Sequence, residues 1–513
     1  MRDPHLSHVN LKVVHQGRPA KEKKCTRIAN ISPNMTFGLH RNTIENLRTA
    51  VLQRVFFVKR NGVFVPPFQP LSQRHFNHIL RRQLRFLCDV SVSTTPVSNH
   101  EFALMYKGRK RVQHMESADS LSVRPVKRRD ANIKCFGKSE KVNLTSKPNA
   151  IQRVVSPAND RYLVATGRYI KPVEKPLCHQ IDKMFGGVTV MKGYNPEEIG
   201  LFISKKWNRF KNPVCVGLDA ERFDQHISAV ALQWEHSIYN HIYKCSHLAT
   251  LLKWQLNVKA FGRTSDGYLK YHIKGTRTSG CINTSLGNII IMCSLLHAYL
   301  RARNLDAEVA NNGDDSVVIM EKEHLPRFMD GFSHWFQRMG FSMKIEDPVY
   351  EIEKITFCQT QPVCVNGRWR MLRDMPLSFA KDSISIKPLD SESVAKRWIH
   401  TVGVGGLTIN AGVPIAQEFY DMYIRSAALM KFKKKKRRGR MDPFLSDPSL
   451  ESGFMFMAQS MEYIGKVPIA DSTRLSFNRA FGINPTVQHG LEDFYKNFTI
   501  VYERTRHTVP VRF

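Results

Sequence analysis

Two adjacent carboxylates in a predicted hairpin place the tightest constraint on the fold of this chain. Asp314 and Asp315 follow an Asn-Gly pair and lie between two β-forming runs, 307–310 and 316–319. An Asn-Gly pair in that position favours a tight turn, so we expect a hairpin whose tip presents both Asp side chains. Neighbouring carboxylates repel each other unless a cation neutralises them, and hard divalent cations prefer oxygen ligands. Gly-Asp-Asp also occurs in ordinary solvated turns, so the tripeptide alone leaves both interpretations open.

A second stretch supplies a third carboxylate. Residues 214–219 alternate as a strand does, with Val214, Val216 and Leu218 on one side and Asp219 at the end of the other. If this strand lies beside the hairpin, three acidic side chains come together. Carboxylates around two Mg²⁺ ions about 4 Å apart suit in-line phosphoryl transfer. The alternative is a capping Asp at a strand end next to a solvated turn.

A polar pair in an apolar segment lies between these two stretches. Ser279 and Gly280 suit a loop before a helix, and an apolar run follows from Ile289 to Tyr299. Thr284 and Asn288 are four residues apart, so they share one helix face. Buried polar side chains need partners, and either a substrate ribose or a structural hydrogen bond satisfies this need.

In order and spacing these residues resemble the three central palm motifs of RNA-dependent RNA polymerases of positive-strand RNA viruses. The motifs are Asp219-x4-Asp224, Ser279-Gly280-x3-Thr284-x3-Asn288 and Gly313-Asp314-Asp315. The closer resemblance is to the plant tombusvirus-like group, which includes carmoviruses and umbraviruses. Segments 106–111, 219–226, 340–346 and 357–362 are similar to that group's own versions. The resemblance runs from about Phe37 to about Asp382.

The resemblance implies an α+β right-hand polymerase with fingers, palm and thumb. We expect an antiparallel palm sheet flanked by helices, a mostly helical thumb, and an N-terminal extension that closes the ring of the enzyme. The expected parts are 1–105 (N-terminal extension and fingers contacts), 106–210 (fingers with a basic motif for triphosphates), 211–385 (palm, with a fingers insertion at about 235–275) and 386–513 (thumb). A separate small helical domain is the alternative for the first hundred residues.

The resemblance also implies roles for individual residues. Asp219, Asp314 and Asp315 are expected to bind two Mg²⁺ ions, with Mn²⁺ as a substitute. Lys344 is expected to help protonate the departing pyrophosphate, and an ordinary surface lysine on a strand is the alternative. The expected nucleotide-binding residues are Asp224, Ser279, Thr284, Asn288, Lys138, Lys147 and Arg153. The expected RNA-binding residues are Arg109, Lys110, Arg111, Gly280, Cys358 and Gln359. The lead-in at 135–137 departs from the usual form of the family, which leaves the register of Lys138 open, and a solvated basic face is the alternative.

The polar trio Asp224, Ser279 and Asn288 favours an RNA polymerase over a reverse transcriptase. By resemblance these side chains surround the ribose and read its 2′-hydroxyl, the group that distinguishes RNA from DNA precursors. A pocket built for a hydroxyl discriminates strongly against substrates that lack one. A reverse transcriptase would instead need a bulky aromatic side chain near position 224.

Charge restricts the class of partner. Lys+Arg 77 minus Asp+Glu 44 gives a net charge of +33, with a pI of about 9.9. Such a surface repels itself unless it meets a polyanion, so RNA is the expected partner and an anionic membrane the rival. A hydrophobic content of 42% argues against a disordered basic tail. A non-catalytic basic RNA-binding protein for packaging or silencing suppression fits the charge equally well, but carboxylates in its groove would repel phosphate.

The sequence also gives expectations about location. Ten cysteines without paired short spacings indicate reduced thiols, and no apolar run reaches about eighteen residues. We expect a protein of the host cytoplasm, recruited peripherally to membrane-bound replication sites by a viral auxiliary protein and host factors. The basic run 431–440 suits RNA, membrane, a nuclear-localisation signal or a solvated loop.

Several local expectations remain. Helices are expected at 43–54, 75–86 and 324–339, and short strand-like pieces at 106–175. Zinc uses ligands such as those at 236–247, but their spacing fits no common zinc pattern. The residues in question are His236, His241, Cys245 and His247.

Overall fold

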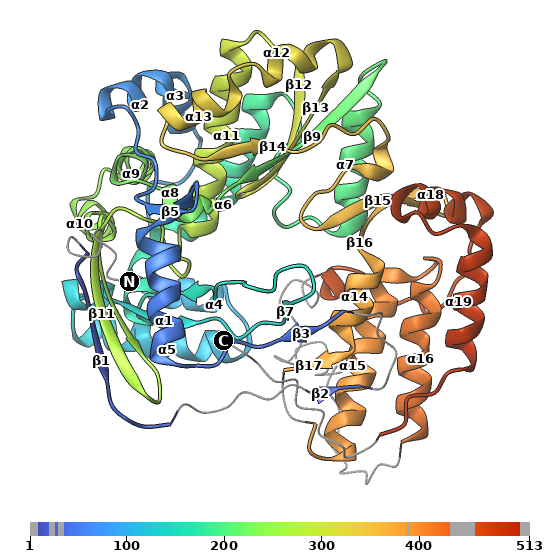
Figure 1. Cartoon of the computed structure of the whole chain (residues 1–513). Helices are drawn as coiled ribbons and strands as arrows, with labels where there is room; N and C mark the ends of the chain where they lie inside the picture. Colours follow the sequence, from blue (N-terminus) through green and yellow to red (C-terminus); the bar gives the residue numbers. More distant parts are fainter. Residues whose placement is uncertain (1–8, 20–25, 29–34, 387–388, 431–456, 503–513) are drawn as a thin grey trace.

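A four-stranded antiparallel sheet, with the strand order β12-β13-β9-β14, lies at the centre of the chain (Figure 1). The computed structural model describes residues 9–19, 26–28, 35–386, 389–430 and 457–502. The strands of this sheet are β9 (Pro213–Ala220), β12 (Ala307–Asn312), β13 (Asp315–Glu321) and β14 (Met343–Ile345). The expectation of an antiparallel sheet and a hairpin over the 307–319 runs is therefore confirmed.

The two faces of this sheet pack into different cores. Val214, Val216 and Leu218 belong to the largest hydrophobic cluster, which includes residues of α6 (Asp160–Phe185) and α11 (Thr284–Ala302). Cys215 belongs to a separate cluster with Val317, Ile319 and residues of α7 (Pro196–Trp207). The predicted alternation along β9 is confirmed, and helices cover both faces of the sheet.

A five-stranded sheet with the order β1-β11-β10-β6-β8 forms a second layer. Only β10 and β6 run parallel within it. Its strands are β1 (Leu11–His15), β6 (Ile133–Gly137), β8 (Val154–Val155), β10 (Asn257–Arg263) and β11 (Gly267–Lys274). The helices α9 (Ala229–Tyr243) and α10 (Ser246–Gln255) precede β10, so the segment at about 235–275 leaves the first sheet and joins the second.

The N-terminal segment links distant parts of the chain. β2 (Thr26–Arg27) pairs with β17 (Ile384–Ser385), and β3 (Phe37–Gly38) pairs with β7 (Val142–Asn143). Phe37 and Leu39 are buried against Ala380 and Ile384, which lie in and after α14 (Met375–Asp382). The segment thus contacts both the region around residue 140 and the region around residue 380 (Figure 1).

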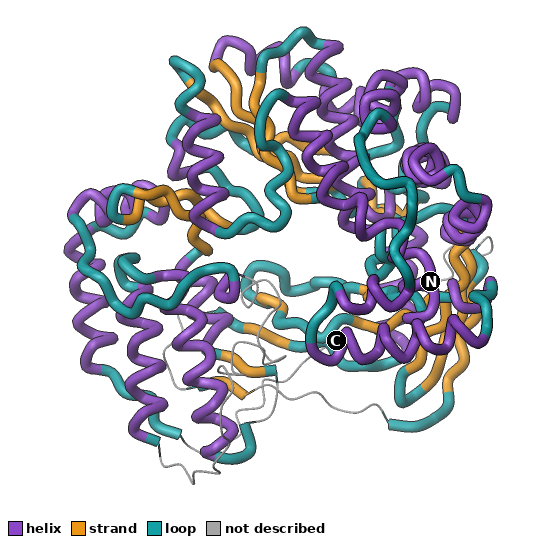
Figure 2. Tube along the Cα trace, turned by 180° about the vertical axis from the view of Figure 1, so that it is seen from behind, coloured by secondary structure: helices purple, strands orange, loops and turns teal. Residues whose placement is uncertain are grey.

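The last part of the chain has its own helical core. It contains α15 (Glu392–Asn410), α16 (Ala416–Leu429), α18 (Asp471–Phe481) and α19 (Pro485–Asn497). Phe419, Tyr420 and Tyr423 lie in this core. The helices lie next to the hairpin of β15 (Thr360–Val365) and β16 (Arg368–Arg373), and the view from behind shows this group of helices together (Figure 2). The expectation of helices is confirmed for this part, whereas the basic run 431–440 lies outside the described residues.

Two of the expected long helices are broken. The 75–86 segment is α2 (Gln73–Ile79) and α3 (Arg81–Cys88), separated at Leu80, whose backbone leaves the helical region. The 324–339 segment is α12 (Leu325–Met329) and α13 (Phe332–Arg338), because Gly331 has a φ of +64° and reverses the chain. The helix expected at 43–54 is α1 (Ile44–Val51), which continues directly into a short π-helix, η2 (Leu52–Phe56).

The expectation of short strand-like pieces at 106–175 is confirmed only in part. Besides β6, β7 and β8 this region holds α5 (Gly108–Val123) and the first part of α6. The frequent Lys and Arg residues obscure the helical spacing of buried Tyr162, Tyr169 and Val173. Arg161 is itself buried and lies 3.6 Å from Asp130, so it serves the fold rather than a channel.

The remaining elements are short. They are β4 (Val58–Arg60), β5 (Val63–Val65), α4 (Asn99–Leu104), α8 (Phe223–His226) and three 3₁₀ turns, η3 (Arg128–Ala131), η4 (Lys322–His324) and η5 (Ile352–Lys354).

One described helix, α11, is long and apolar enough to cross a membrane by length and composition. In the folded chain 78% of its apolar window is buried among other elements. This helix therefore serves as a core helix of the fold. The nine cysteines within the described residues are all free thiols, as expected.

Candidate active site

The turn between β12 and β13 carries the first two carboxylates. Asn312 pairs with Asp315, so the two-residue loop is Gly313-Asp314, one position later than the Asn-Gly signal suggested. Gly313 has a φ of +87°, which favours glycine at this position. Asp314 therefore lies at the tip of the turn and Asp315 begins the returning strand.

A buried asparagine holds this turn in shape. Asn311 is fully buried, and its Nδ2 donates hydrogen bonds to the Gly313 carbonyl (2.8 Å) and to Ser316 Oγ (2.8 Å). Its Oδ1 accepts a hydrogen bond from the Gly313 N–H (3.1 Å). The sequence analysis did not single out Asn311, although an Asn directly before an Asn-Gly pair is a signal that could have done so.

Sheet register brings the third carboxylate to the same place. Leu218 on β9 pairs with Ser316 on β13, so Asp219 at the end of β9 lies next to Asp315. On the other side of β9, Lys344 of β14 is paired with Asp219. Directly opposite residues on antiparallel strands share a face, so the exposed Lys344 side chain lies beside this carboxylate.

Mutual repulsion among these carboxylates affects their protonation. Although Asp315 is solvent-accessible, the surrounding protein removes enough water to raise its pKa to about 6, and the charges of Asp314, Asp219 and Glu346 add to this effect. Burial and the charge of Asp219 also raise the pKa of Glu346. The sequence analysis missed Glu346. The unsubstituted Gly217 gives it room, because a Cβ at that position would collide with its carboxylate.

The donor chemistry of this cluster fits divalent cations. Within the described part of the chain, no ion pair joins Asp219, Asp314 or Asp315 to a Lys or Arg side chain, so a cation would relieve the repulsion. Among the described residues, no group of three or more His, Cys, Asp or Glu is arranged closely enough to hold a metal ion. The carboxylates are thus suitable ligands by type and charge, but they are spaced more widely than the ligands of a bound metal ion.

The expected ribose residues fall into two groups. Asn288 Nδ2 donates to Asp224 Oδ1 (2.7 Å), and the charge of Asp314 contributes to a raised pKa of Asp224, which burial raises most. Ser279 Oγ accepts a hydrogen bond from the Ser156 N–H (2.9 Å), whereas the Thr284 hydroxyl donates to the Thr278 carbonyl (2.7 Å). Asp224 and Asn288 are thus brought together near the hairpin. For Thr284, the structure shows the structural hydrogen bond that was the alternative to a contact with the substrate ribose.

A cluster of guanidinium groups lies near Asp224. The exposed Arg153 side chain lies 3.5 Å from the Glu140 carboxylate. Its positive charge acts to lower the pKa of Asp224, against the larger effect of burial. Burial, together with the charges of Arg222 and Arg153, lowers the pKa of Arg54 to about 10. An anion bound here would relieve this repulsion. The sequence analysis missed Arg54 and Arg222, because they become neighbours of Arg153 only through folding.

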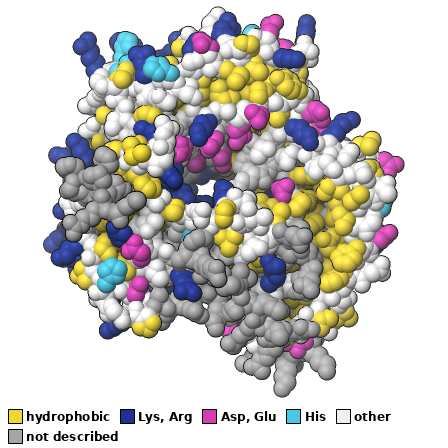
Figure 3. Space-filling view, viewed as in Figure 1, with side chains coloured by type: hydrophobic (Ala, Val, Ile, Leu, Met, Phe, Trp, Pro, Cys, Tyr) yellow, Lys and Arg dark blue, Asp and Glu magenta, His cyan; other side chains and the backbone are white. Residues whose placement is uncertain are grey.

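The expected lysines are arranged differently. Lys138 lies 3.0 Å from Glu140 and shares that carboxylate with Arg153, while Lys147 is exposed on the loop between β7 and β8. The space-filling view shows acidic side chains gathered beside a central opening, with Lys and Arg side chains near its rim (Figure 3). The structure thus links Lys138 to Arg153 through the Glu140 carboxylate.

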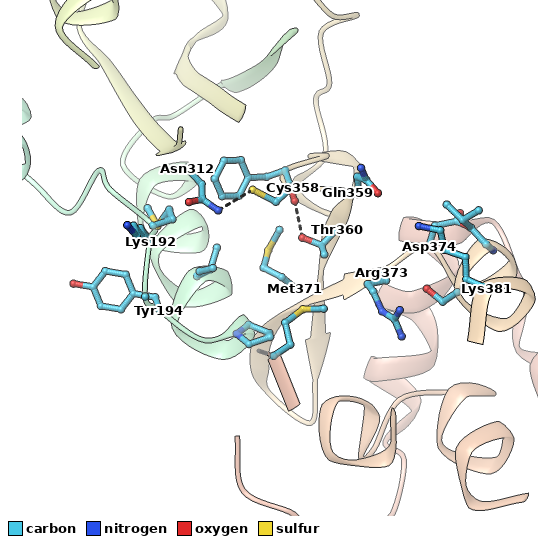
Figure 4. A pocket seen from close by; sticks show the side chains of 18 residues that line it. Lys192, Tyr194, Asn312, Cys358, Gln359, Thr360, Met371, Arg373, Asp374 and Lys381 are labelled. Atoms are coloured by element: carbon cyan, nitrogen blue, oxygen red, sulfur yellow. Dashed lines mark hydrogen bonds between the residues drawn. The ribbon is translucent and has the colours of Figure 1, made fainter. Parts of the chain in front are cut away.

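Cys358 and Gln359 form a strained turn beside the hairpin. Both have positive φ values, +51° and +60°, and the turn is closed by hydrogen bonds between the backbones of Phe357 and Thr360. Asn312 Nδ2 points at Cys358 Sγ at 3.5 Å (Figure 4). A mostly apolar cavity of about 360 Å³ lies under this turn, with Met371 among its lining residues.

The other expected RNA-binding residues lie at two places. Arg109, Lys110 and Arg111 are exposed in the first turn of α5, with Lys110 Nζ 5.4 Å from the centre of the Tyr106 ring. Gly280 pairs with Pro157, and a Cβ at Gly280 would collide with that proline. The geometry thus explains Gly280 by close packing of two segments.

Three of the four residues considered for zinc have other partners. His236 Nε2 is 3.2 Å from Gln255 Oε1, and burial lowers the His236 pKa to about 4. His247 and Cys245 both contact the Tyr169 hydroxyl. These contacts give His236, Cys245 and His247 structural partners within the fold.

The site combines carboxylates on neighbouring antiparallel strands with an Asp–Asn pair and a guanidinium cluster. Carboxylates suit divalent cations and guanidinium groups suit phosphates, which is the combination that nucleotidyl transfer needs. Comparison with known proteins agrees. The family described as viral RNA dependent RNA polymerase matches residues 11–503. The chain belongs to this family, which has the right-hand polymerase fold, and its mixed helix and sheet content agrees with that fold.

Similar proteins include the RNA-directed RNA polymerase of Turnip crinkle virus, which is 36% identical over 96% of this chain and 62% of the relative. The RNA-directed RNA polymerase of Tobacco necrosis virus (strain A) is 38% identical over 95% of this chain and 66% of the relative. That of Groundnut rosette virus (strain MC1) is 34% identical over 96% and 56%. The chain thus spans less than two thirds of the length of these relatives.

Proposed function

We propose that this chain copies an RNA template into RNA and thereby replicates a viral positive-strand genome. The observation that carries the proposal is the meeting of Asp219, Asp314 and Asp315 at one edge of the sheet, with the Asp224–Asn288 pair beside them. The names of the relatives support the same activity.

In this proposal Asp219, Asp314 and Asp315 hold two divalent cations, with Mg²⁺ as the expected ion and Mn²⁺ as a substitute. When bound, such ions lower the pKa of an attacking hydroxyl and neutralise the leaving pyrophosphate. The hydroxyl of the primer 3′ end, or of the first nucleotide in an unprimed start, releases its proton to solvent water as its oxygen bonds to the α-phosphorus. The bond from that phosphorus to pyrophosphate breaks, and Lys344 beside Asp219 supplies a proton to the leaving group.

Substrate recognition uses groups from several elements. Arg153, with Lys138 and Lys147, holds the triphosphate, and the neighbouring Arg54 adds a cation whose lowered pKa favours an anionic partner. Asp224, Ser279 and Asn288 read the ribose 2′-hydroxyl. Thr284 supports the loop that carries Ser279.

We assign the parts of the right-hand architecture as follows. The four-stranded sheet with 211–385 is the palm, against which α6 and α7 of the 106–210 segment pack. The five-stranded sheet with the rest of 106–210 and the insertion at about 235–275 is the fingers. The helical core after 386 is the thumb, and β2 and β3 of the 1–105 extension connect the two sides. Arg109, Lys110, Arg111, Cys358 and Gln359 contact template or nascent RNA, while Gly280 lets the loop of Ser279 pack closely against Pro157.

The proposal includes partners and a location. We also infer that a viral auxiliary protein and host factors recruit the protein to membrane-bound replication sites in the host cytoplasm. Flotation of the purified protein with anionic liposomes tests this inference. Strong binding without any partner would oppose it.

The decisive experiment is incorporation of labelled ribonucleotides on an RNA template with Mg²⁺, comparing wild type with Asp314→Ala. We expect synthesis by the wild type and a loss of at least about a thousandfold in the variant, with RNA binding kept, since a ligand of the reacting centre is removed. Asp493→Ala, at a side chain 70% exposed on α19, is the matched control and should synthesise normally. Tight RNA binding without synthesis in all three proteins would favour the non-catalytic RNA-binding protein.

A further inference from the structure

A fully buried ion pair lies behind the proposed ribose site. Glu235 on α9 has no exposed side-chain surface, and Arg277, in the loop before α11, has a side chain 1% exposed. Arg277 Nη2 donates to Glu235 Oε2 at 2.5 Å. Burying two charges is expensive, and apolar residues of the same volume often serve stability as well, so such a pair suggests a second purpose.

The pair is connected to Asp224 through one amide. Arg277 Nε donates to Asn288 Oδ1 (3.1 Å), and Asn288 Nδ2 donates to Asp224 Oδ1 (2.7 Å). An amide oxygen cannot donate, so a guanidinium N–H on one side of Asn288 fixes which end of the amide faces Asp224. The backbone N–H of Arg277 also donates a hydrogen bond to the backbone carbonyl of Asp224 (2.8 Å), which connects the two loops.

The far side of the pair is equally constrained. Glu235 Oε1 accepts hydrogen bonds from Asn283 Nδ2 (2.8 Å) and from the Tyr239 hydroxyl (2.9 Å). The pair also needs a glycine, because a Cβ at Gly287 would collide with both Glu235 and Arg277. These contacts hold the Glu235 carboxylate in place, and Glu235 and Asn288 in turn hold Nη2 and Nε of Arg277.

The orientation has a consequence for the substrate. With Oδ1 of Asp224 engaged by Asn288, no hydrogen bond within the described residues engages Asp224 Oδ2. An acceptor held in one direction can bind a substrate hydroxyl, and a substrate without the hydroxyl leaves it unpaired. We propose that Glu235 and Arg277 are positioning residues for sugar selection, which orient Asn288 and Asp224 so that ribonucleotides are preferred to deoxyribonucleotides.

This inference rests on the proposed polymerase function, and the test separates the two. Arg277→Lys keeps the buried charge next to Glu235 but removes the guanidinium fork that reaches Asn288. We measure incorporation of ATP and dATP opposite the same template base, and the equilibrium binding of both nucleotides. The preference for ATP should fall by at least about tenfold in the variant.

A matched control is present elsewhere in the chain. Arg474 and Glu492 form a pair with side chains 9% and 4% exposed, between α18 and α19. Arg474→Lys makes the same chemical change there and should leave the ATP:dATP ratio unchanged. If Arg277→Lys does not fold, the double variant Glu235→Gln with Arg277→Met, which leaves no buried charge unpaired, should fold and show the same loss of preference.

The outcomes are distinct. If the ATP:dATP ratio of the Arg277 variants equals that of the wild type, the positioning role is overturned and the polymerase function stands. The same holds if Arg474→Lys loses as much of the preference for ATP as Arg277→Lys does. If the wild type makes no RNA, the proposed function fails. In that case, equal affinity of the wild type for ATP and dATP overturns the inference as well, whereas a binding preference that Arg277→Lys abolishes supports it.

Discussion

At the scale of single residues, the buried amide of Asn311 controls the turn that carries Asp314. Asn311→Ala removes an acceptor from the Gly313 N–H and donors from the Gly313 carbonyl and Ser316 Oγ. Unsatisfied buried groups cost about 1–3 kcal/mol, so we expect a modest fall in the melting temperature. Because the turn positions a proposed metal ligand, RNA synthesis should fall by about ten- to a hundredfold.

Calorimetry and the incorporation assay check this prediction together. The neighbouring variant Asn312→Ala is the control. The Asn312 side chain is exposed, and it contacts Cys358 Sγ instead of the backbone of the turn between β12 and β13. Equal losses of synthesis in the two variants would show that Asn311 has no special role.

A buried histidine predicts how stability depends on pH. Burial lowers the pKa of His236 to about 4, so the folded state keeps it neutral while the unfolded state takes up a proton near pH 6.5. The stabilisation is therefore complete above about pH 6.5 and is lost as the pH falls towards 4, with a limit of about 3 kcal/mol. Thermal unfolding between pH 8 and 5 should show this loss, and a His236→Gln variant should show less of it. An identical pH profile in the variant would contradict the assignment.

At the scale of elements, β3 shows how a two-residue strand can join distant regions. Phe37 is 1% exposed and packs with Leu39, Ala380 and Ile384, while its strand pairs with β7. Phe37→Ala should lower the free energy of unfolding by about 3–5 kcal/mol, the usual cost of truncating a buried Phe.

Denaturant unfolding measures this effect. Phe494→Ala, at a side chain 50% exposed on α19, is the control and should cost much less. If the two substitutions cost the same, β3 is not a structural link between the region around residue 140 and α14.

At the scale of the whole molecule, the net charge of +33 predicts salt-sensitive RNA binding. If the chain neutralises 6–10 phosphates, affinity should fall by about 10³–10⁵ between 50 and 200 mM salt. Filter binding or fluorescence anisotropy at several salt concentrations checks this. A shallow dependence would mean that the basic surface does not follow the RNA backbone, and Asp314→Ala should leave the slope unchanged.

The sequence alone determined the positions of the carboxylates in their elements. Alternation along residues 214–219 gave the strand that ends in Asp219, and the Asn-Gly pair gave the hairpin of Asp314 and Asp315. These patterns have short periods, so each could be recognised within one segment. The same reasoning failed where a local break interrupts a periodic run, as at Leu80 and Gly331, because apolar spacing continues across the break.

Only the tertiary structure decided which side chains surround those carboxylates. Glu346 meets Asp219 through strand pairing, Arg54 meets Arg153 through packing, and Glu235 meets Arg277 across 42 residues of sequence. No spacing rule connects such residues, because their contact depends on how whole elements pack. The ordered motifs thus identified the carboxylates, and the folded chain fixed the surroundings that set their protonation and orientation.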